Sequence, residues 1–364
     1  MNRTQKSSII WGIFLVAGYI SCVLLSSSLK SYSPTVITPQ PGETVATASP
    51  LKSEKVRQIA DNTLSLREYW RTSYKCIPGD RYDPDIQAKA GYIIYNDCTG
   101  WNTGQLRVLD AQSGTWVWEI HPVGDGAQTL LVDSERVYFA NSLKLYAYAL
   151  DDGERLWERP LPSNVDRMHV DGERLQINGY VERQPTYLEF NIHTGEPLGN
   201  TPEERPDGRL IAMPYPSFIL LQLPDDQLQA VEKDTQRVLW TADLGGGAII
   251  PRPLVLDDLL LVAVGSQVCV LDLLTGQIKW QTEGSFAASN IVFANESVYA
   301  LDYHTRLVRL DVRTGQETGY VQFIPDDIVA PDKWYPEEEH RVAVDGEMVF
   351  VVFGDTHELI ALGP

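Results

Sequence analysis

A 13-residue phrase returns along the chain about every 40 residues. In each copy an apolar strand ends in Asp or a close substitute, a turn of the Thr-Gly kind follows, and an apolar step leads to Trp. Four copies are complete, at residues 106–118, 145–157, 228–240 and 268–280. Two more, at 187–199 and 307–319, keep the turn but carry Gly at the Trp position. The repeat restricts the fold strongly, because every copy must form the same structural unit.

The period of the repeat indicates its architecture. The turn positions are 114, 153, 195, 236, 276 and 315, so neighbouring turns are 39, 42, 41, 40 and 39 residues apart. Four-stranded propeller blades have periods of roughly 40 to 50 residues, whereas helical repeats are mostly shorter. Asp-Gly turns between β-rich runs, as at Asp171-Gly172 and Asp345-Gly346, are typical of hairpins. The sequence therefore predicts an all-β propeller.

The two ends of the repeat region predict how the ring closes. Residues 358–362 supply the strand before the turn of a last repeat, but no Trp strand follows them. Residues 64–70 form a Trp-bearing strand without a partner in their own repeat. Counting the Trp positions and their Gly variants at 70, 118, 157, 199, 240, 280 and 319 gives seven four-stranded blades, closed by the N-terminal Trp strand. Closure matters because it leaves no unpaired third strand in the last blade.

The phrase resembles the V-x-A-L-D-x-x-T-G-x-x-x-W signature of the pyrroloquinoline-quinone-like propeller superfamily, with Val268 to Trp280 as the best match. The likeness covers roughly residues 64–364. It implies that the Trp side chains pack between adjacent blades and that the turn glycines adopt a positive φ. The structural repeat residues are then Trp70, Trp118, Trp157, Trp240, Trp280, Gly114, Gly153, Gly195, Gly276 and Gly315.

The redox chemistry of that superfamily is not expected here. Its quinoprotein dehydrogenases use a disulfide between adjacent cysteines, and this chain has no Cys-Cys pair. The haem, zinc, nucleophile-elbow, phosphate-loop and EF-hand motifs are missing too. We therefore predict no catalytic, cofactor-binding or metal residues. A propeller enzyme with a small ligand in the axial funnel stays open as an alternative, because a site assembled from distant residues escapes a motif search.

The N-terminus predicts export. Residues 1–8 carry Arg3 and Lys6 without an acidic residue, and an uncharged apolar run follows from Ile9 to about Leu25. Residues 1–27 are thus a signal anchor or a cleaved signal peptide, with lipidation at Cys22 as a third version. Residues 28–55 are predicted to form a flexible Ser/Thr/Pro linker, and residues 56–364 the propeller. We expect a membrane-anchored propeller in the periplasm or outside the cell, or a secreted one if the N-terminal segment is cleaved.

Two cysteines lie in an unusually long connection. Trp70 and Trp118 are 48 residues apart, and Cys76 and Cys98 fall between them. An exported domain permits a disulfide there, so Cys76 and Cys98 are a candidate pair. Cys269 lies inside an apolar strand and is predicted to be a buried thiol.

Charge limits the partners. The chain carries −19, and residues 1–55 contribute five basic and two acidic side chains, which leaves 25 basic against 47 acidic, or −22, for the remainder. Nucleic acid is therefore not an expected partner.

Two loops are candidate sites. Residues 325–340 are predicted to form an insertion within the last blade, and its aromatic pair, Trp334 and Tyr335, are candidate anchors for a partner. The carboxylates of residues 337–339 beside His340, and those of Asp80, Asp83 and Asp85, are interpreted as solvated loop residues rather than metal ligands.

The predicted function is a non-catalytic protein-binding scaffold. By resemblance, its model is the propeller lipoprotein of the outer-membrane β-barrel assembly machinery, which is exported and non-enzymatic. The expected partner is another envelope or extracellular protein, and contact with the membrane runs through the N-terminal segment only. A glycan-binding module of the envelope or cell surface is the second alternative.

Overall fold

The computed structural model describes most of the propeller region and a short part of the preceding segment. The described residues are 35–38, 58–73, 86–96, 106–121, 129–141, 144–162, 164–181, 184–200, 209–212, 218–223, 227–232, 235–245, 249–265, 267–283, 286–302, 305–324, 341–353 and 357–364. None of these residues belongs to a helix that is long and apolar enough to cross a membrane. The predicted anchor, residues 1–27, lies outside the described residues.

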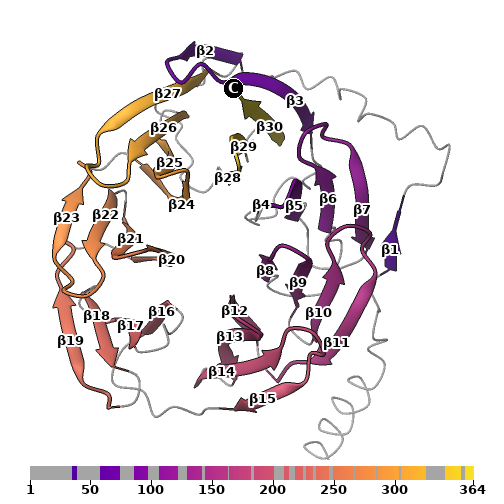
Figure 1. Ribbon diagram of the computed structural model, residues 1–364, viewed down its shortest axis with the longest axis vertical. Coiled ribbons are helices and arrows are strands. Elements are labelled where there is room, and N and C mark those ends of the chain that lie inside the picture. Colours follow the sequence, from indigo (N-terminus) through magenta and orange to yellow (C-terminus); the bar gives the residue numbers. More distant parts are fainter. Residues whose placement is uncertain are drawn as a thin grey trace, which may run out of the picture. The chain divides into compact units, whose positions relative to one another are not determined.

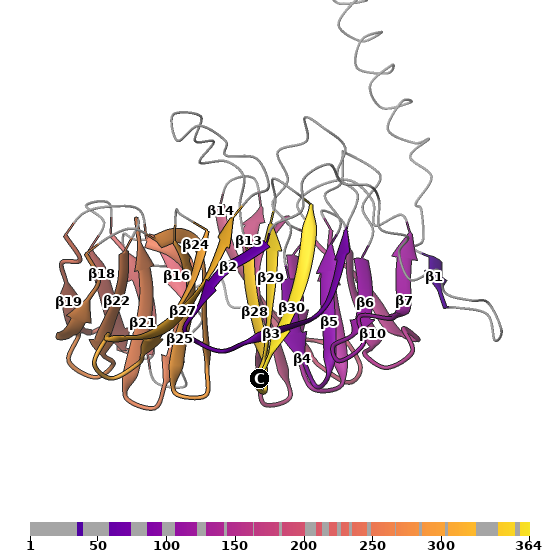
Figure 2. The same cartoon turned by 90° about the horizontal axis from the view of Figure 1, so that it is seen from above.

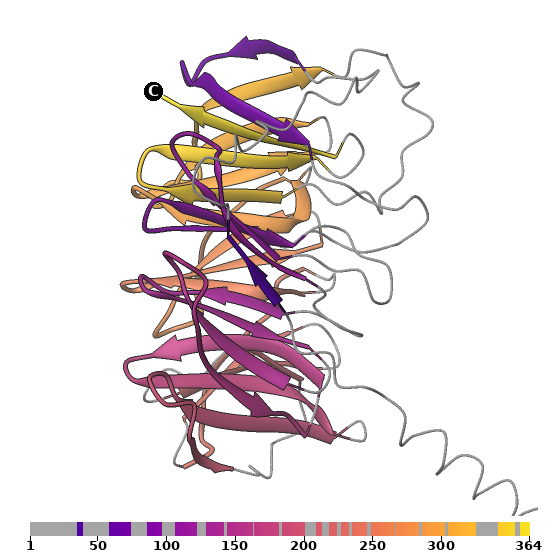
Figure 3. The same ribbon diagram turned by 90° about the vertical axis from the view of Figure 1, so that its right-hand side faces the viewer.

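Seven antiparallel sheets stand side by side in a ring (Figure 1). Each sheet is one blade with four strands that follow one another from the centre of the ring outward, and two blades gain a fifth strand at the rim. Figure 3, in which the ring is seen from its side, shows the blades as successive layers. The predicted seven-bladed, four-stranded propeller is confirmed.

The strand bounds follow the repeat. The innermost strands of blades 1 to 7 are β4 (Ile86–Lys89), β8 (Thr129–Val132), β12 (Asn164–Asp171), β16 (Arg209–Ala212), β20 (Ile249–Leu256), β24 (Phe286–Ala294) and β28 (Arg341–Asp345). The second strands are β5 (Tyr92–Asn96), β9 (Arg136–Ala140), β13 (Arg174–Val181), β17 (Phe218–Gln222), β21 (Leu259–Val264), β25 (Ser297–Asp302) and β29 (Met348–Phe353). The third strands are β6 (Leu106–Asp110), β10 (Lys144–Ala149), β14 (Gln184–Asn191), β18 (Leu228–Glu232), β22 (Gln267–Asp272), β26 (Arg306–Asp311) and β30 (Glu358–Gly363).

The outermost strands carry the Trp positions of the repeat. In blades 1 to 7 they are β7 (Trp116–His121), β11 (Arg155–Pro160), β15 (Pro197–Asn200), β19 (Val238–Ala242), β23 (Ile278–Gln281), β27 (Glu317–Ile324) and β3 (Arg67–Ser73). In blade 7, β3 pairs antiparallel with β30, and Trp70 lies opposite Ala361. The sequence indicates a strand from residue 64, whereas β3 begins at Arg67.

Two short strands extend the rims of blades 1 and 6. β1 (Thr35–Ile37) pairs antiparallel with β7, and β2 (Gln58–Asn62) pairs antiparallel with β27. Figure 2 shows β2 and β3 following one another along the outside of blades 6 and 7. β1 lies inside residues 28–55, for which the sequence predicts only a linker.

Apolar clusters between neighbouring blades form the core. Strand residues alternate between the two faces of a sheet, and both faces of a blade are covered in a ring, so the central strands are apolar on both sides. β21 and β30 are buried along their whole length. Six of the seven junctions share one cluster of buried apolar side chains drawn from both blades. The junction between blades 3 and 4 is the exception among the described residues, where Ile219, Leu221 and Val231 of blade 4 form a cluster by themselves.

Candidate protein-binding site

The turns of the repeat share one backbone geometry. In all six turns the amide of the turn residue donates to the carbonyl four residues earlier, as from Gly114 to Asp110 (2.9 Å) and from Gly276 to Asp272 (2.8 Å). The five turn glycines have φ between +67° and +75°, a region that glycine enters without a steric penalty. Gln236 holds a similar φ of +57° with a side chain.

The acidic residue that opens a turn caps it. The Oδ1 atom of Asp311 accepts hydrogen bonds from the amide of Thr314 (2.8 Å) and from its hydroxyl (2.8 Å). These bonds, the hydroxyl bond first, lower the pKa of Asp311. Asp272 makes the equivalent bonds to Thr275, and Lys279, at 3.1 Å, is the largest cause of its lowered pKa. A charged carboxylate therefore stabilises these turns more than a protonated one does.

Each Trp of the repeat ties its blade to the turn of the next blade. The indole N–H donates to a turn carbonyl in five pairs, which are Trp70 to Ala111 (3.0 Å), Trp118 to Leu150 (2.9 Å), Trp157 to Ile192 (3.0 Å), Trp240 to Leu273 (3.0 Å) and Trp280 to Val312 (2.8 Å). The ring also covers the turn glycine, because a Cβ on Gly276 would lie 2.5 Å from the Trp240 ring. Gly at the turn is thus favoured by the positive φ, which Gln236 also adopts, and required where an indole covers the turn.

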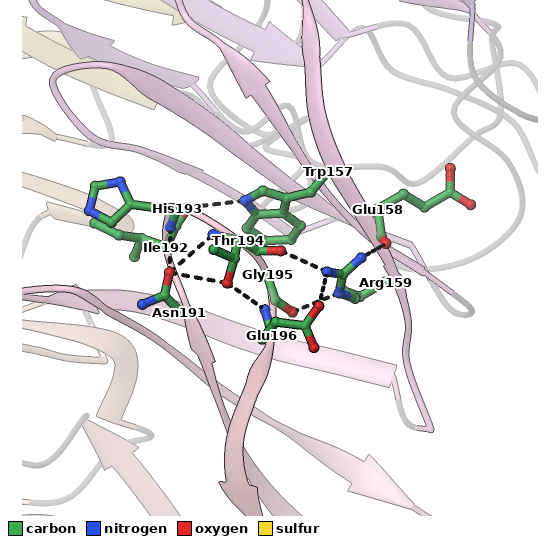
Figure 4. A network of polar contacts seen from close by, with 9 residues as sticks. All are labelled: Trp157, Glu158, Arg159, Asn191, Ile192, His193, Thr194, Gly195 and Glu196. Carbon is green, nitrogen blue, oxygen red and sulfur yellow. Dashed lines mark hydrogen bonds and ion pairs between the residues drawn. The ribbon is translucent and has the colours of Figure 1, made fainter.

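Figure 4 shows the polar contacts at one of these junctions, between blades 2 and 3. Beside the indole of Trp157, the guanidinium of Arg159 donates to the carbonyls of Thr194 (2.7 Å) and Gly195 (2.9 Å) and pairs with Glu196 (2.6 Å). Asn191 caps the same turn in place of Asp. The junction is therefore fixed by both an apolar contact and a charged one.

The Gly at position 319 has a structural explanation. Blade 7 has no turn between its third and outermost strands, because β30 and β3 come from distant parts of the chain. A Trp in blade 6 would have no turn glycine to cover. Leu64 lies there instead, and a Cβ on Gly319 would come within 2.5 Å of its Cδ2 atom. The sequence does not reveal this contact, since Leu64 lies outside the repeat phrase.

The junction between blades 3 and 4 has neither the Trp nor the turn glycine of the contact described above. Gly199 stands at the Trp position of blade 3, and Gln236 stands at the turn position of blade 4, where it is exposed. Leu175 and Ile177 of β13 face blade 2, so the alternation of the strand turns Gln176 and Asn178 toward blade 4. Gln176 is buried and donates to Glu189 (3.1 Å). A polar face of blade 3 thus stands toward an apolar face of blade 4.

The buried charged side chains belong to strand ends. Asp302 pairs with Arg306 (3.0 Å), and Glu358 pairs with Arg71 (2.8 Å). Burial lowers the pKa of the Arg341 guanidinium to about 9. Burial also raises the pKa of the Cys269 thiol to about 11, so this cysteine is not activated as a nucleophile. No three His, Cys, Asp or Glu side chains gather as a metal site within the described ranges.

Exposed apolar side chains mark the rim of the ring. The outermost strand of every blade has a bulge just before the Trp position, which leaves one residue out of register. Four of these residues are large, apolar and exposed, namely Tyr69 (50%), Leu156 (43%), Leu198 (48%) and Leu239 (40%). Val238 beside the last of them is 51% exposed. The sequence pattern contains these residues, but only the bulge turns them outward.

Several predicted site residues lie outside the described residues. These are the candidate partner loop with Trp334 and Tyr335, the candidate disulfide of Cys76 and Cys98, and the acidic groups at 80–85 and 337–340. The ten structural repeat residues all lie within the described part of the chain. In each of the five hydrogen-bonded pairs, the Trp and the turn belong to adjacent blades.

Two solved structures of low sequence identity share the fold, and a third is similar with a lower TM-score. The Cps50 (Swd1) β-propeller domain of Myceliophteria thermophila matches with 12% identity and a TM-score of 0.58, over 81% of this chain and 100% of that one. A chain of a mitotic checkpoint complex matches with 10% identity and a TM-score of 0.59, over 84% and 94%. BamB from Moraxella catarrhalis matches with 12% identity and a TM-score of 0.49, over 82% and 100%. A comparison with curated protein sequences gave no significant match.

A family model covers the repeat region itself. The model described as outer membrane protein assembly factor BamB matches residues 67–212 and 188–324, which together are well over half of the chain. These ranges contain the Trp strands and turns described above. The chain therefore belongs to the BamB-type family of pyrroloquinoline-quinone-like β-propeller proteins.

Proposed function

We propose that this protein is a non-catalytic scaffold that binds another protein through its propeller. The observation that carries the proposal is the match to a family described as an assembly factor for outer membrane proteins, which is a role exercised on other proteins. The ring supports such a role, because its blades are tied to one another by buried indoles and by side-chain bonds to backbone carbonyls. Rigid frames of this kind hold binding loops at little entropic cost.

The proposed contact is the loop of residues 325–340, with Trp334 and Tyr335 as its anchors. Aromatic side chains give a large contact area and lose little conformational freedom on binding. The strands that flank this loop, β27 and β28, belong to adjacent blades 6 and 7, so a framework of two blades supports it.

A crosslinking experiment tests the scaffold and its loop. A photoreactive side chain at position 333 of the full-length chain, beside the two anchors, is expected to capture one protein reproducibly in native membranes. The Trp334→Ala, Tyr335→Ala variant should lose that partner while its thermal unfolding stays unchanged. A matched variant at an exposed residue away from the loop, Thr318→Ala, should keep it. A partner that survives the loop variant would contradict the loop assignment, and capture of glycan or no protein would contradict the scaffold.

We also propose that residues 1–27 anchor the propeller at the extracytoplasmic face of a membrane through a linker at 28–55. The basic flank of Arg3 and Lys6 before the apolar run supports this orientation. Protease added to spheroplasts should cleave the propeller, and urea-resistant sedimentation with membranes should require residues 1–27. A protected propeller would refute the orientation.

Export places the protein in an oxidising compartment, so we also propose a disulfide. Cys76 and Cys98 are expected to form a disulfide in an oxidising compartment, where such a bridge contributes roughly 3 kcal/mol on the chain-entropy estimate. Mass spectrometry of the alkylated protein before and after reduction should show two additional alkyl groups after reduction. Full alkylation of both cysteines without a reductant would exclude the bridge.

A further inference from the structure

The outermost strand of each blade is a sheet edge with unpaired backbone groups. Such edges invite pairing with another chain, and proteins cover them or protect them with charge and proline. Two of the seven edges are covered by the chain itself. β1 lies on β7 and β2 lies on β27, both as antiparallel extra strands. This ring therefore accepts extended segments at its rim.

Four of the remaining edges carry protective residues. β3 contains three charged side chains, β11 contains three and ends in proline, β15 begins with proline and has only four residues, and β23 is equally short with a lysine at the bulge. The charges and prolines are Arg67, Glu68, Arg71, Arg155, Glu158, Arg159, Pro160, Pro197 and Lys279. These edges disfavour a docking strand.

The edge of blade 4 has no such protection. β19 reads Val-Leu-Trp-Thr-Ala, without charge or proline, and it ends the order β16-β17-β18-β19. Val238 is 51% exposed and Leu239 is 40% exposed, while Trp240 and Ala242 point into the core shared with blade 5. Within the described residues no strand pairs with the outer edge of β19, which lies beside two exposed apolar side chains.

The contact between an indole and the turn residue is missing beside this edge. At the other turns an indole from the preceding blade covers the residue at the turn position, so Gly195 and Gly276 are buried, whereas Gln236 is exposed. On the neighbouring rim of blade 3, Leu198 is 48% exposed. The apolar residues that a partner strand would contact therefore occupy adjacent blades at a junction that has neither the Trp nor the turn glycine of the five hydrogen-bonded junctions.

We propose that β19 is a docking site for an extended segment of a protein partner, which pairs antiparallel with it as a fifth strand of blade 4. This inference rests on the proposed scaffold function but uses a different surface from the loop at 325–340. The segment is expected to have apolar residues at alternate positions, which pack on Val238 and Leu239. Basic flanks are expected as well, because the part of the chain after residue 55 carries −22.

The test uses the full-length chain in detergent and a synthetic probe, the peptide Lys-Thr-Val-Thr-Val-Thr-Lys. Its control replaces the central Thr with Pro, which removes a ladder hydrogen bond. Hydrogen exchange should show slower exchange of the β19 amides with the probe at about 1 mM and no change with the Pro peptide. No slowing of the β19 amides, or slowing confined to another edge, would overturn the proposal.

Charged variants locate the site. Val238→Lys with Leu239→Lys should weaken probe binding at least about tenfold, because charges on an edge oppose strand addition. Both side chains are largely exposed, so the thermal unfolding should stay close to that of the parent protein. The matched control is Leu156→Lys, at the same bulge position of blade 2 with 43% exposure, and it should bind the probe normally. Equal losses in both variants would overturn the assignment to β19.

Two further readouts separate the possible failures. If the parent protein forms a dimer that the Val238→Lys, Leu239→Lys variant abolishes, the occupant is a second copy and the partner assignment is wrong. If the crosslink at position 333 captures its protein equally well in this variant and the probe does not bind β19 of the parent protein, the edge inference fails while the scaffold function stands. If the parent protein captures no protein and binds no probe, the scaffold proposal fails as well.

Discussion

At the scale of single residues, the repeat places a Trp on one blade and a Gly on the adjacent blade, and each of these residue types fits the other. The indole of Trp157 needs a flat, side-chain-free surface, and Gly195 with φ +67° needs to have no Cβ. The sequence shows the two residue types at fixed positions. It does not show that the Trp of one repeat contacts the turn of the following repeat about 35 residues later, as the bond from Trp157 to Ile192 does.

A double-mutant cycle tests this pair. Trp157→Ala should destabilise the protein by about 3–5 kcal/mol, because it empties a buried site. Gly195→Ala should destabilise it by about 2–4 kcal/mol, from the positive φ and from a Cβ placed 2.7 Å from the ring. In the Trp157→Ala background the same Gly195→Ala change should cost only about 1–2 kcal/mol. Urea denaturation measures all four proteins.

Gln236 provides a matched control for that cycle. It has a φ of +57° without a covering indole, so Gln236→Ala should change the free energy of unfolding by less than about 0.5 kcal/mol. Additive effects at Trp157 and Gly195 would show that the ring and the turn do not interact.

The turn carboxylates predict an acid-dependent stability. Because the pKa of Asp311 is lower in the folded protein than its ordinary value of 3.8, the charged form is favoured by folding. Its contribution is fully present above pH 3.8 and is lost as the pH falls toward the lowered folded-state pKa. Asp311→Asn should fold, since Asn191 caps a turn of the same kind. Its stability should decline less than that of the parent between pH 4 and pH 2, as about one titrating group is removed. Identical acid-unfolding curves would contradict this assignment.

At the scale of elements, the junctions are not equivalent. Six are filled by apolar side chains from both blades, whereas Gln176 and Asn178 of blade 3 stand toward Ile219 and Leu221 of blade 4. A polar face against an apolar one gains little from burial. This junction is therefore expected to be the weakest interface of the ring.

Restoring the tie at this junction tests that expectation. Gly199→Trp combined with Gln236→Gly should raise the free energy of unfolding by about 1–3 kcal/mol, by burying an indole on the turn. Gly199→Trp alone should not stabilise, because a Cβ at the turn position meets the indole, as the geometry at Gly276 shows. Differential scanning calorimetry gives the comparison. Equal effects of the single and double variants would mean that the indole does not reach the turn.

At the scale of the whole molecule, blade 7 combines β3, from near the start of the described chain, with three strands from its end. We propose that β3 closes the propeller through its pairing with β30, while Leu64 and β2 cover the end of blade 6. Without β3, the third strand of blade 7 would be an exposed edge whose only charged residue is Glu358.

Truncation tests the closure. A protein that begins at residue 56 should unfold cooperatively, whereas one that begins at residue 74 should lose cooperativity or aggregate. A peptide of residues 56–73 added in trans should restore the cooperative transition, and the same peptide with Trp70→Ala should do so less well. Equal stability of the two truncated proteins would refute the closing role of β3.

The sequence by itself determined the repeat, the number of blades and the turn chemistry of this protein. These features depend on simple rules. Strand alternation and the positive φ at the turn can be read from neighbouring residues, and the fixed period can be read from the spacing of the copies. It also contained Gly199, Gln236 and Gly319 as departures, but it did not assign them a cause.

Only the tertiary structure decided what those departures mean. Gly319 is explained by Leu64, which lies far away in sequence, and the open junction at Gly199 and Gln236 is visible only once blades 3 and 4 are placed side by side. The exposure of Val238 and Leu239 likewise follows from a bulge and an unpaired edge. The physical reason is that packing between blades joins residues with no local relation, so a repeat pattern specifies each blade but not the contacts at which blades differ.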